Sequence, residues 1–190
     1  MKFDDKIGSI QQILTATNVG ILRRQAIIKE LNLKKGQTVI DIGCGGGHLV
    51  EEISMCIGSS GKAIGVDPSE FQIKTAKERC KNLPNVQFLC SNASDINIDK
   101  SSCDAVTFTQ TLEYIDDVDE ALYSAKKLQK PLSIFVNVST LWDFFGFHGP
   151  EKKLNDMMHE IYRSQKHPML PTKLNGKLEK QGYKNIKTLE

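Results

Sequence analysis

Short apolar runs alternate with helical patterns along most of the chain. The runs occupy residues 38–42, 63–67, 86–90, 105–108 and 132–138, and they are rich in β-branched residues. Runs of this length bounded by turn residues predict buried strands. Strands that alternate with helices predict an α/β fold with a doubly wound, mainly parallel sheet and helices on both faces. In such a sheet, ligands bind at the carboxyl ends of the strands.

Helices are expected between these strands and at both ends of the chain. Residues 1–35 have apolar positions at helical spacing and predict an N-terminal helical cap. Gly20 interrupts that pattern, so one helix and two helices are both compatible with it. Further helices are expected from Leu49 to Gly58, from Ser69 onward and around residues 118–128.

The C-terminal part of the chain is less regular. Residues 150–166 predict an amphipathic helix with methionines in its apolar stripe, which is typical of core or lid packing. Residues 140–170 are therefore expected to form a lid or substrate region. One more helix, closed by Gly182, is expected before a terminal strand at 183–189.

Length and charge narrow the classes of function. A chain of 190 residues corresponds to one domain at roughly 150 residues per domain. The formal net charge is +2, too small for a protein that captures nucleic acid by charge. No apolar run reaches the roughly 18 residues of a membrane span, and the first residues do not resemble a signal peptide. We expect a single cytoplasmic domain, 1–190, with no nucleic-acid partner and no membrane span.

The five cysteines predict neither a metal site nor a disulfide framework. They contain no Cys-x-x-Cys pair, and their number is odd. Most are expected to be buried small apolar residues.

The most informative stretch is residues 39–48, which read VIDIGCGGGH. Glycines at 43, 45 and 47 permit a tight turn and a close approach of the backbone to a ligand. A dinucleotide fingerprint, G-x-G-x-x-G, would require glycine where His48 stands. Asp41 lies two residues before the first glycine, and its carboxylate suits an ammonium or sulfonium ligand better than a pyrophosphate.

This acid-x-Gly-x-Gly-x-Gly pattern resembles motif I of the class I S-adenosyl-L-methionine (SAM)-dependent methyltransferases. The resemblance covers residues 20–140. It implies a Rossmann-like sheet of order 3-2-1-4-5 plus a terminal strand, and the family's last antiparallel strand has no counterpart in the sequence pattern. It also implies that Asp41, Gly43, Cys44, Gly45 and Gly47 bind SAM.

Asp67 is the second candidate acid. It ends the second predicted strand, 22 residues after Gly45, close to the roughly 20-residue spacing of a ribose-binding acid. Its carboxylate can accept hydrogen bonds from both ribose hydroxyls, and the alternative is a helix N-cap. Ser69 and Glu70 resemble the residues that follow the ribose acid in the family, so Pro68 and Ser69 are assigned to the same site.

Two further strand ends complete the predicted cofactor site. In the resembled family an Asp-Ala step after the third strand faces adenine; here Asn92-Ala93 takes that place, and the amide oxygen of Asn92 can still accept a hydrogen bond. A plain loop asparagine is the alternative. After the fourth strand, Thr109 and Gln110 are expected to border the methionine end of SAM. The Asn/Asp-Pro-Pro-aromatic sequence of nucleobase amine methyltransferases is absent there.

Several residues are candidates for the acceptor side of the site. Glu113 is either substrate-facing or solvated. Trp142 and Phe145 either line a substrate pocket or pack under a lid. His148 is the best placed candidate for a general base if the acceptor must lose a proton, and an ordinary surface histidine is the favoured alternative. Arg23 and Arg24 either lie over the SAM carboxylate or occupy a solvated helix face, and the solvated face is favoured.

The sequence thus predicts an enzyme that transfers the methyl group of SAM to an oxygen, nitrogen or carbon atom of a small-molecule acceptor by in-line displacement. The alternative is a catalytically inactive SAM-binding regulatory or scaffold protein. An NAD-linked oxidoreductase is disfavoured by Asp41 and His48.

Overall fold

The computed structural model describes residues 5–146, 151–163 and 165–189. The elements in chain order are α1 (Asp5–Ala16), α2 (Asn18–Leu31), β1 (Thr38–Ile42), α3 (His48–Ile57), β2 (Lys62–Asp67), α4 (Glu70–Arg79), β3 (Val86–Cys90), β4 (Cys103–Thr109), η1 (Leu112–Tyr114), α5 (Val118–Leu128), β5 (Gln129–Val138), η2 (Trp142–Phe144), α6 (Lys152–Arg163) and α7 (Leu170–Lys180).

The five strands form one sheet in the order β3-β2-β1-β4-β5, and every neighbouring pair is parallel. The predicted α/β class, strand order and doubly wound topology are therefore confirmed. Because all strands run the same way, the chain segments that leave β1 to β4 emerge along one edge of the sheet.

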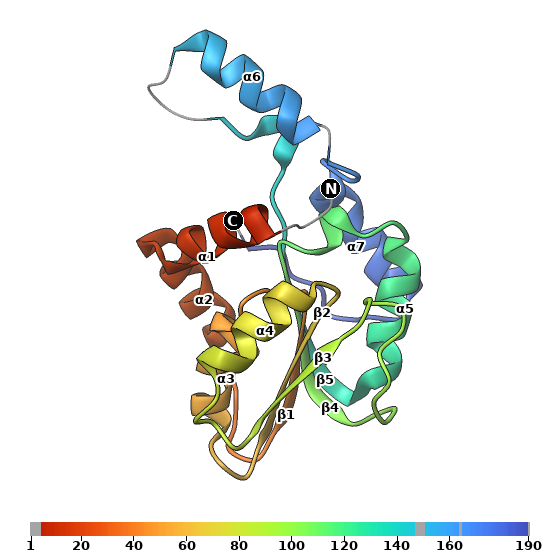
Figure 1. Ribbon diagram of the computed structural model, residues 1–190. Coiled ribbons are helices and arrows are strands. Elements are labelled where there is room, and N and C mark those ends of the chain that lie inside the picture. Colours follow the sequence, from red (N-terminus) through yellow and green to blue (C-terminus); the bar gives the residue numbers. More distant parts are fainter. Residues whose placement is uncertain (1–4, 147–150, 164, 190) are drawn as a thin grey trace.

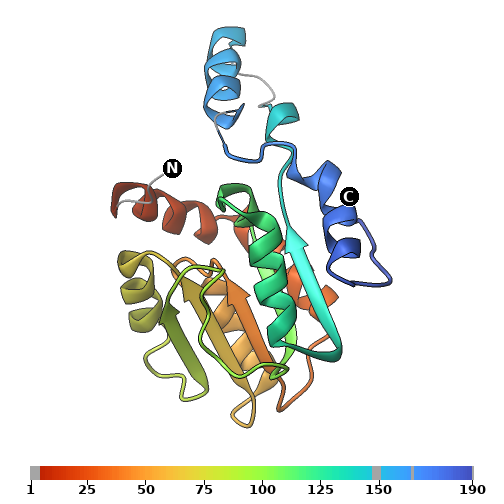
Figure 2. The same cartoon turned by 90° about the vertical axis from the view of Figure 1, so that its right-hand side faces the viewer.

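Helices cover both faces of the sheet (Figures 1 and 2). On one face, α5 and α7 pack against strand residues such as Ile40, Val106 and Phe108. On the other face, α2, α3 and α4 pack against Val39 and Ala105. The central strands are thus buried on both sides, which is why apolar residues such as Val39, Ile40 and Val106 occupy both faces instead of alternating with exposed polar ones.

The N-terminal region forms two helices, which resolves the alternatives left by Gly20. Thr17 caps α2 by accepting a hydrogen bond from Gly20 N, and a Cβ on Gly20 would overlap the Thr15 carbonyl. Arg24 is buried and pairs with Glu52 of α3 at 2.6 Å. The favoured prediction of a solvated Arg24 was therefore wrong, and its role is to fasten α2 to α3.

The predicted terminal strand at 183–189 does not form. Gly182 and Asn185 both have positive φ, at 79° and 56°, which interrupts any extended run there. Tyr183 instead packs against Phe135 of β5 in a tilted arrangement, with ring centroids 4.9 Å apart. Among the described residues, β5 is an edge strand.

The helix α6 projects away from the sheet and its covering helices, together with η2 (Figure 1). The helix predicted within residues 150–166 is present as α6, and Met157 on it is exposed. None of the described helices is both long enough and apolar enough to cross a bilayer.

Candidate functional site

The glycine-rich stretch forms a turn between β1 and α3. Gly43, Gly45 and Gly47 have φ values of 78°, 51° and 80°, a region that favours glycine. The amides of Gly43 and Cys44 donate to Val66 O at 2.7 and 2.9 Å, so the turn is fixed to β2. The backbone of the turn is therefore held at the carboxyl end of β2.

Substitution of Gly43 by alanine is expected to lower the free energy of unfolding by about 1–3 kcal/mol, because a positive φ is strained for alanine. The added Cβ would also overlap the side chain of Thr111. Gly176→Ala in α7 is the matched control, since it meets no atom within 4 Å and should stabilise the helix by about 1 kcal/mol. Urea unfolding of both variants tests this, and equal stabilities would contradict it.

Asp41 lies beneath the turn with 2% of its surface exposed. Its Oδ1 has no hydrogen-bond partner among the described residues. Burial, and then the nearby charge of Asp67, raise the pKa of Asp41 to about 8. Among the described residues, no cationic side chain forms an ion pair with this carboxyl, so a positively charged ligand group would relieve an unfavourable burial.

Asp67 ends β2 and faces the same turn. Its Oδ2 accepts from Gly45 N and its Oδ1 accepts from Ser69 N, both at 2.9 Å. Burial raises its pKa against the lowering effect of these two bonds. The N-cap of α4 is Ser69, whose hydroxyl accepts from Gln72 N, so the alternative role predicted for Asp67 belongs to Ser69.

Two threonines of β4 continue a polar row next to Asp41. Thr107 pairs in register with Asp41, and Thr109 lies two residues further on the same face. The hydroxyls of Thr107 and Thr109 are buried without a hydrogen-bond partner in the described part of the chain. Each of these three neighbouring side chains thus has a buried oxygen whose hydrogen-bonding capacity the described residues do not use.

The remaining predicted cofactor residues lie along the same edge. Pro68 and Asn92 are exposed and Ala93 is half-buried. The strand end that carries Asn92 is fastened to Asp67, because Ser91 N donates to Asp67 O at 3.2 Å. Gln110 N donates to Val138 O at 2.7 Å, which places Gln110 between the ends of β4 and β5. The structure therefore brings the predicted cofactor residues to adjacent strand ends.

Helix α1 lies over the glycine turn through contacts that sequence analysis missed. Gln12 donates to the side-chain oxygen of Gln72 at 2.8 Å, and Gln72 donates to Gln11 at 2.7 Å. The side chain of Gln12 occupies the space that a Cβ on Gly46 would need. Arg79 donates to Gly46 O at 2.9 Å. No local pattern marks these residues, because their partners are far away in sequence.

The neutral forms of His48 and Cys44 are favoured beside the turn. Burial, and then Arg79 and Arg24, lower the pKa of His48 to about 4. Burial, and then Asp41 and Asp67, raise the pKa of Cys44 well above its usual value. Neither side chain adds charge to the site at neutral pH.

The candidates on the acceptor side have different surroundings. Glu113 is fully buried in η1, so the solvated alternative was wrong. Trp142 and Phe145 are half-buried, and their rings contact each other in a tilted arrangement, with centroids 5.5 Å apart. His148 lies outside the described residues.

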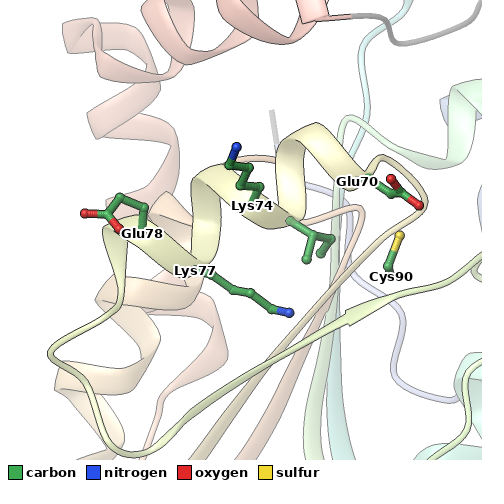
Figure 3. Close-up of a pocket in the computed structure, with 6 residues that line it drawn as sticks. Glu70, Lys74, Lys77, Glu78 and Cys90 are labelled. Atoms are coloured by element: carbon green, nitrogen blue, oxygen red, sulfur yellow. The ribbon is translucent and has the colours of Figure 1, made fainter.

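A separate pocket of about 580 Å³ lies along α4, and Figure 3 shows it. It is lined by Glu70, Ile73, Lys74, Lys77, Glu78 and Cys90. It contains none of the predicted cofactor residues, although Cys90 contacts Pro68 O through its thiol at 3.6 Å. This pocket is therefore distinct from the strand ends that carry the predicted cofactor residues.

The cysteines are all free thiols, and Cys44, Cys80 and Cys103 are buried. Within the described part of the chain, no cluster of three or more His, Cys, Asp or Glu side chains could hold a metal ion.

Comparisons with known proteins identify the family of the chain. Residues 33–187 match a family model described as a methyltransferase domain. The demethylmenaquinone methyltransferase of Staphylococcus carnosus (strain TM300) is 32% identical over 117 residues, which cover 62% of this chain and 48% of that protein. The corresponding protein of Staphylococcus aureus (strain MRSA252) is 28% identical over 117 residues, again 62% and 48%. The chain thus spans about half the length of these curated relatives.

Solved structures share the fold. A SAM-dependent methyltransferase from Aquifex aeolicus superposes with a TM-score of 0.79 and 22% identity, covering 100% of this chain and 93% of that one. Phosphoethanolamine N-methyltransferase 2 of Haemonchus contortus, in complex with SAM, gives a TM-score of 0.77 and 19% identity, covering 97% and 43%.

Proposed function

The chain belongs to the methyltransferase-domain family, and from this membership we propose that it binds SAM at the carboxyl ends of β1 to β4 and transfers the methyl group to a small-molecule acceptor. The family membership and the strand order confirm the predicted resemblance and its fold, and SAM is the cofactor of that family. The residues that hold SAM and the acceptor are our proposal.

One observation carries the proposal: two buried acids, Asp41 and Asp67, flank a glycine turn, and neither has a cationic partner among the described residues. A pyrophosphate placed there would add negative charge next to two carboxyl groups. A ligand with sulfonium and ammonium groups would instead favour their ionised forms. The charge of the site therefore favours SAM over a dinucleotide.

Each acid has a separate task in this proposal. Each oxygen of Asp67 already accepts one backbone N–H and retains a second lone pair, so the two oxygens can accept the two ribose hydroxyls. Asp41, with Thr107 and Thr109 beside it, would hold the amino acid end. The amide of Asn92 would accept from the adenine amino group.

The protein's contribution to the reaction is mainly positioning. SAM, when bound, supplies a methyl group that its sulfonium already activates. The chain must then hold the acceptor in line with the breaking bond, which can lower a barrier by about 7–11 kcal/mol. Trp142 and Phe145 offer an aromatic surface for an acceptor, and the demethylmenaquinone methyltransferases among the relatives support a quinol as the first compound to test. His148 is proposed as the general base.

Thermal unfolding with different nucleotides tests the cofactor assignment. SAM at about 100 times its Kd is expected to stabilise the folded chain by about 2.7 kcal/mol, whereas NAD at the same concentration should leave the melting temperature unchanged. Isothermal titration then measures the affinity for SAM directly. Stabilisation by NAD alone would refute the proposal.

The alternative, a SAM-binding scaffold without activity, is supported by the open edge of β5 in the described part of the sheet. Release of S-adenosylhomocysteine distinguishes the two functions. A short-chain demethylmenaquinol, together with a panel of phenols and amines, provides the acceptors. Tight SAM binding with no product from any of them would favour the scaffold.

A further inference from the structure

The base of the arm formed by η2 and α6 is fastened to a single short turn. At its first end, Thr140 N donates to Oε1 of Glu113 at 3.0 Å. At its second end, His167 N donates to the carbonyl of Glu113 at 3.2 Å. The two ends also contact each other, since Trp142 N donates to Pro168 O at 3.1 Å. Both chain ends of the arm therefore meet at Glu113.

The side chain of Glu113 is unusual for a structural turn. It is fully buried, with 0% of its surface exposed, and it forms no ion pair among the described residues. Burial raises its pKa, although Thr140 N, the Ser139 hydroxyl and the charge of Arg23 act in the opposite direction. Burial of a carboxyl is costly, and an apolar residue of similar size would fill the space at less cost. The bonds from Thr140 N and the Ser139 hydroxyl are the specific contacts that the carboxyl adds.

The same turn touches the proposed cofactor site. Thr111, two residues before Glu113, lies against Gly43 and donates to Thr109 O at 3.0 Å. Gln110 contacts the Thr140 hydroxyl through its side-chain amide. A continuous set of contacts therefore runs from the glycine turn through residues 109–113 to Thr140. Trp142 lies two residues further along the chain.

We propose that Glu113 is a positioning residue that fixes where Trp142 and Phe145 stand relative to the carboxyl end of β4. By holding Thr140 through its side chain and His167 through its carbonyl, it joins the acceptor side of the site to the cofactor side. That Trp142 and Phe145 serve an acceptor rests on the proposed function, whereas the anchoring itself does not.

Two substitutions at Glu113 separate anchoring from simple packing. In Glu113→Leu, no side-chain atom can accept from Thr140 N, whereas in Glu113→Gln the amide oxygen still can. Trp142 is the only tryptophan of the chain, so its fluorescence reports directly on the arm. We expect a shifted emission maximum in Glu113→Leu and about 10- to 100-fold faster hydrogen exchange at the Thr140 amide. Glu113→Gln should restore both signals, and SAM affinity by titration should change little in either variant.

A second pair of variants leaves the buried turn intact. Thr140→Pro removes the donor N–H, and Thr140→Ala keeps it while removing the hydroxyl. Only Thr140→Pro is expected to reproduce the Trp142 emission of Glu113→Leu. The matched control is Asp104→Leu, which removes a carboxylate that accepts from Thr38 N at 2.8 Å at the opposite end of β4.

The outcomes distinguish the anchoring from the proposed function. The inference is overturned if Glu113→Leu and Thr140→Pro fold with the Trp142 emission of the wild type, or if Asp104→Leu shifts that emission equally. If the wild type does not bind SAM but Glu113→Leu still shifts the Trp142 emission, the anchoring is supported and the proposed function fails.

Discussion

Replacement of Asp67 by alanine is expected to weaken SAM binding by about 10²- to 10⁴-fold. Hydrogen bonds to an ionised group contribute about 1.5–3 kcal/mol each, and the variant loses the two proposed for the ribose hydroxyls. It also releases the amides of Gly45 and Ser69, which the carboxylate now holds at 2.9 Å. Isothermal titration with SAM measures the change, and an unchanged affinity would refute the ribose assignment.

The control for this variant is Asp117→Ala. Asp117 caps α5 by accepting from Glu120 N at 3.0 Å, so it also holds a backbone amide at the start of a helix. Its loss should cost about 0.5–2 kcal/mol of stability and leave SAM affinity as in the wild type. If both variants lost SAM binding equally, the effect of Asp67→Ala would be one of stability rather than of ligand contact.

The sheet was predictable because each strand can be identified from its own short stretch of sequence. The runs that became β1 to β4 are apolar, short and bounded by turn residues, and parallel strands buried on both faces need no more than this. The glycine turn was predictable for the same reason, since an acid and spaced glycines occupy one short segment. The ends of adjacent parallel strands then bring Asp41 and Asp67 together without further information.

The prediction of a C-terminal strand at 183–189 was wrong, because the backbone of this segment is not extended. Asn185 has φ 56°, and Tyr183 and Ile186 pack against the core as separate side chains rather than as part of a ladder. The start of β5 was also misplaced. The strand begins at Gln129, before Pro131, and continues through Leu132 at φ 63° with an irregular register against β4.

The parts of the site that the sequence did not reveal depend on contacts between distant residues. Gln12 and Gln72 are 60 residues apart, and Glu113 reaches Thr140 across 27. No local feature of the sequence around Glu113 shows whether its side chain is solvated or is buried and bonded to another segment. In the structure the chain after β5 contacts Glu113 through Thr140, and the glutamate is fully buried.

Asp41 makes the folded chain sensitive to pH in a definite direction. Its pKa is about 8 in the folded state against 3.8 when unperturbed, so between these values the folded chain holds a proton that the unfolded chain has released. Stability from this group is therefore fully present below about pH 4 and is lost as pH rises toward 8. SAM binding should change in the opposite sense, because a cationic ligand favours the ionised carboxylate.

Asp41→Asn is accordingly expected to stabilise the chain and to impair binding. Removal of the ionisable group should raise the free energy of unfolding at pH 8 by about 1–3 kcal/mol, since a charge is no longer buried without a partner. The loss of a charge-assisted contact should weaken SAM binding about 10- to 100-fold. Urea unfolding at pH 6 and pH 8 measures the first effect. Titration in buffers of different ionisation enthalpy measures the second, together with the proton that the wild type should release on binding.

The control variant is Asp99→Asn, at an exposed loop position, which should change neither the stability nor the SAM affinity. An Asp41→Asn protein that is less stable at pH 8 and binds SAM as tightly as the wild type would contradict both the burial argument and the proposed contact, because the same unpaired oxygen underlies the two effects.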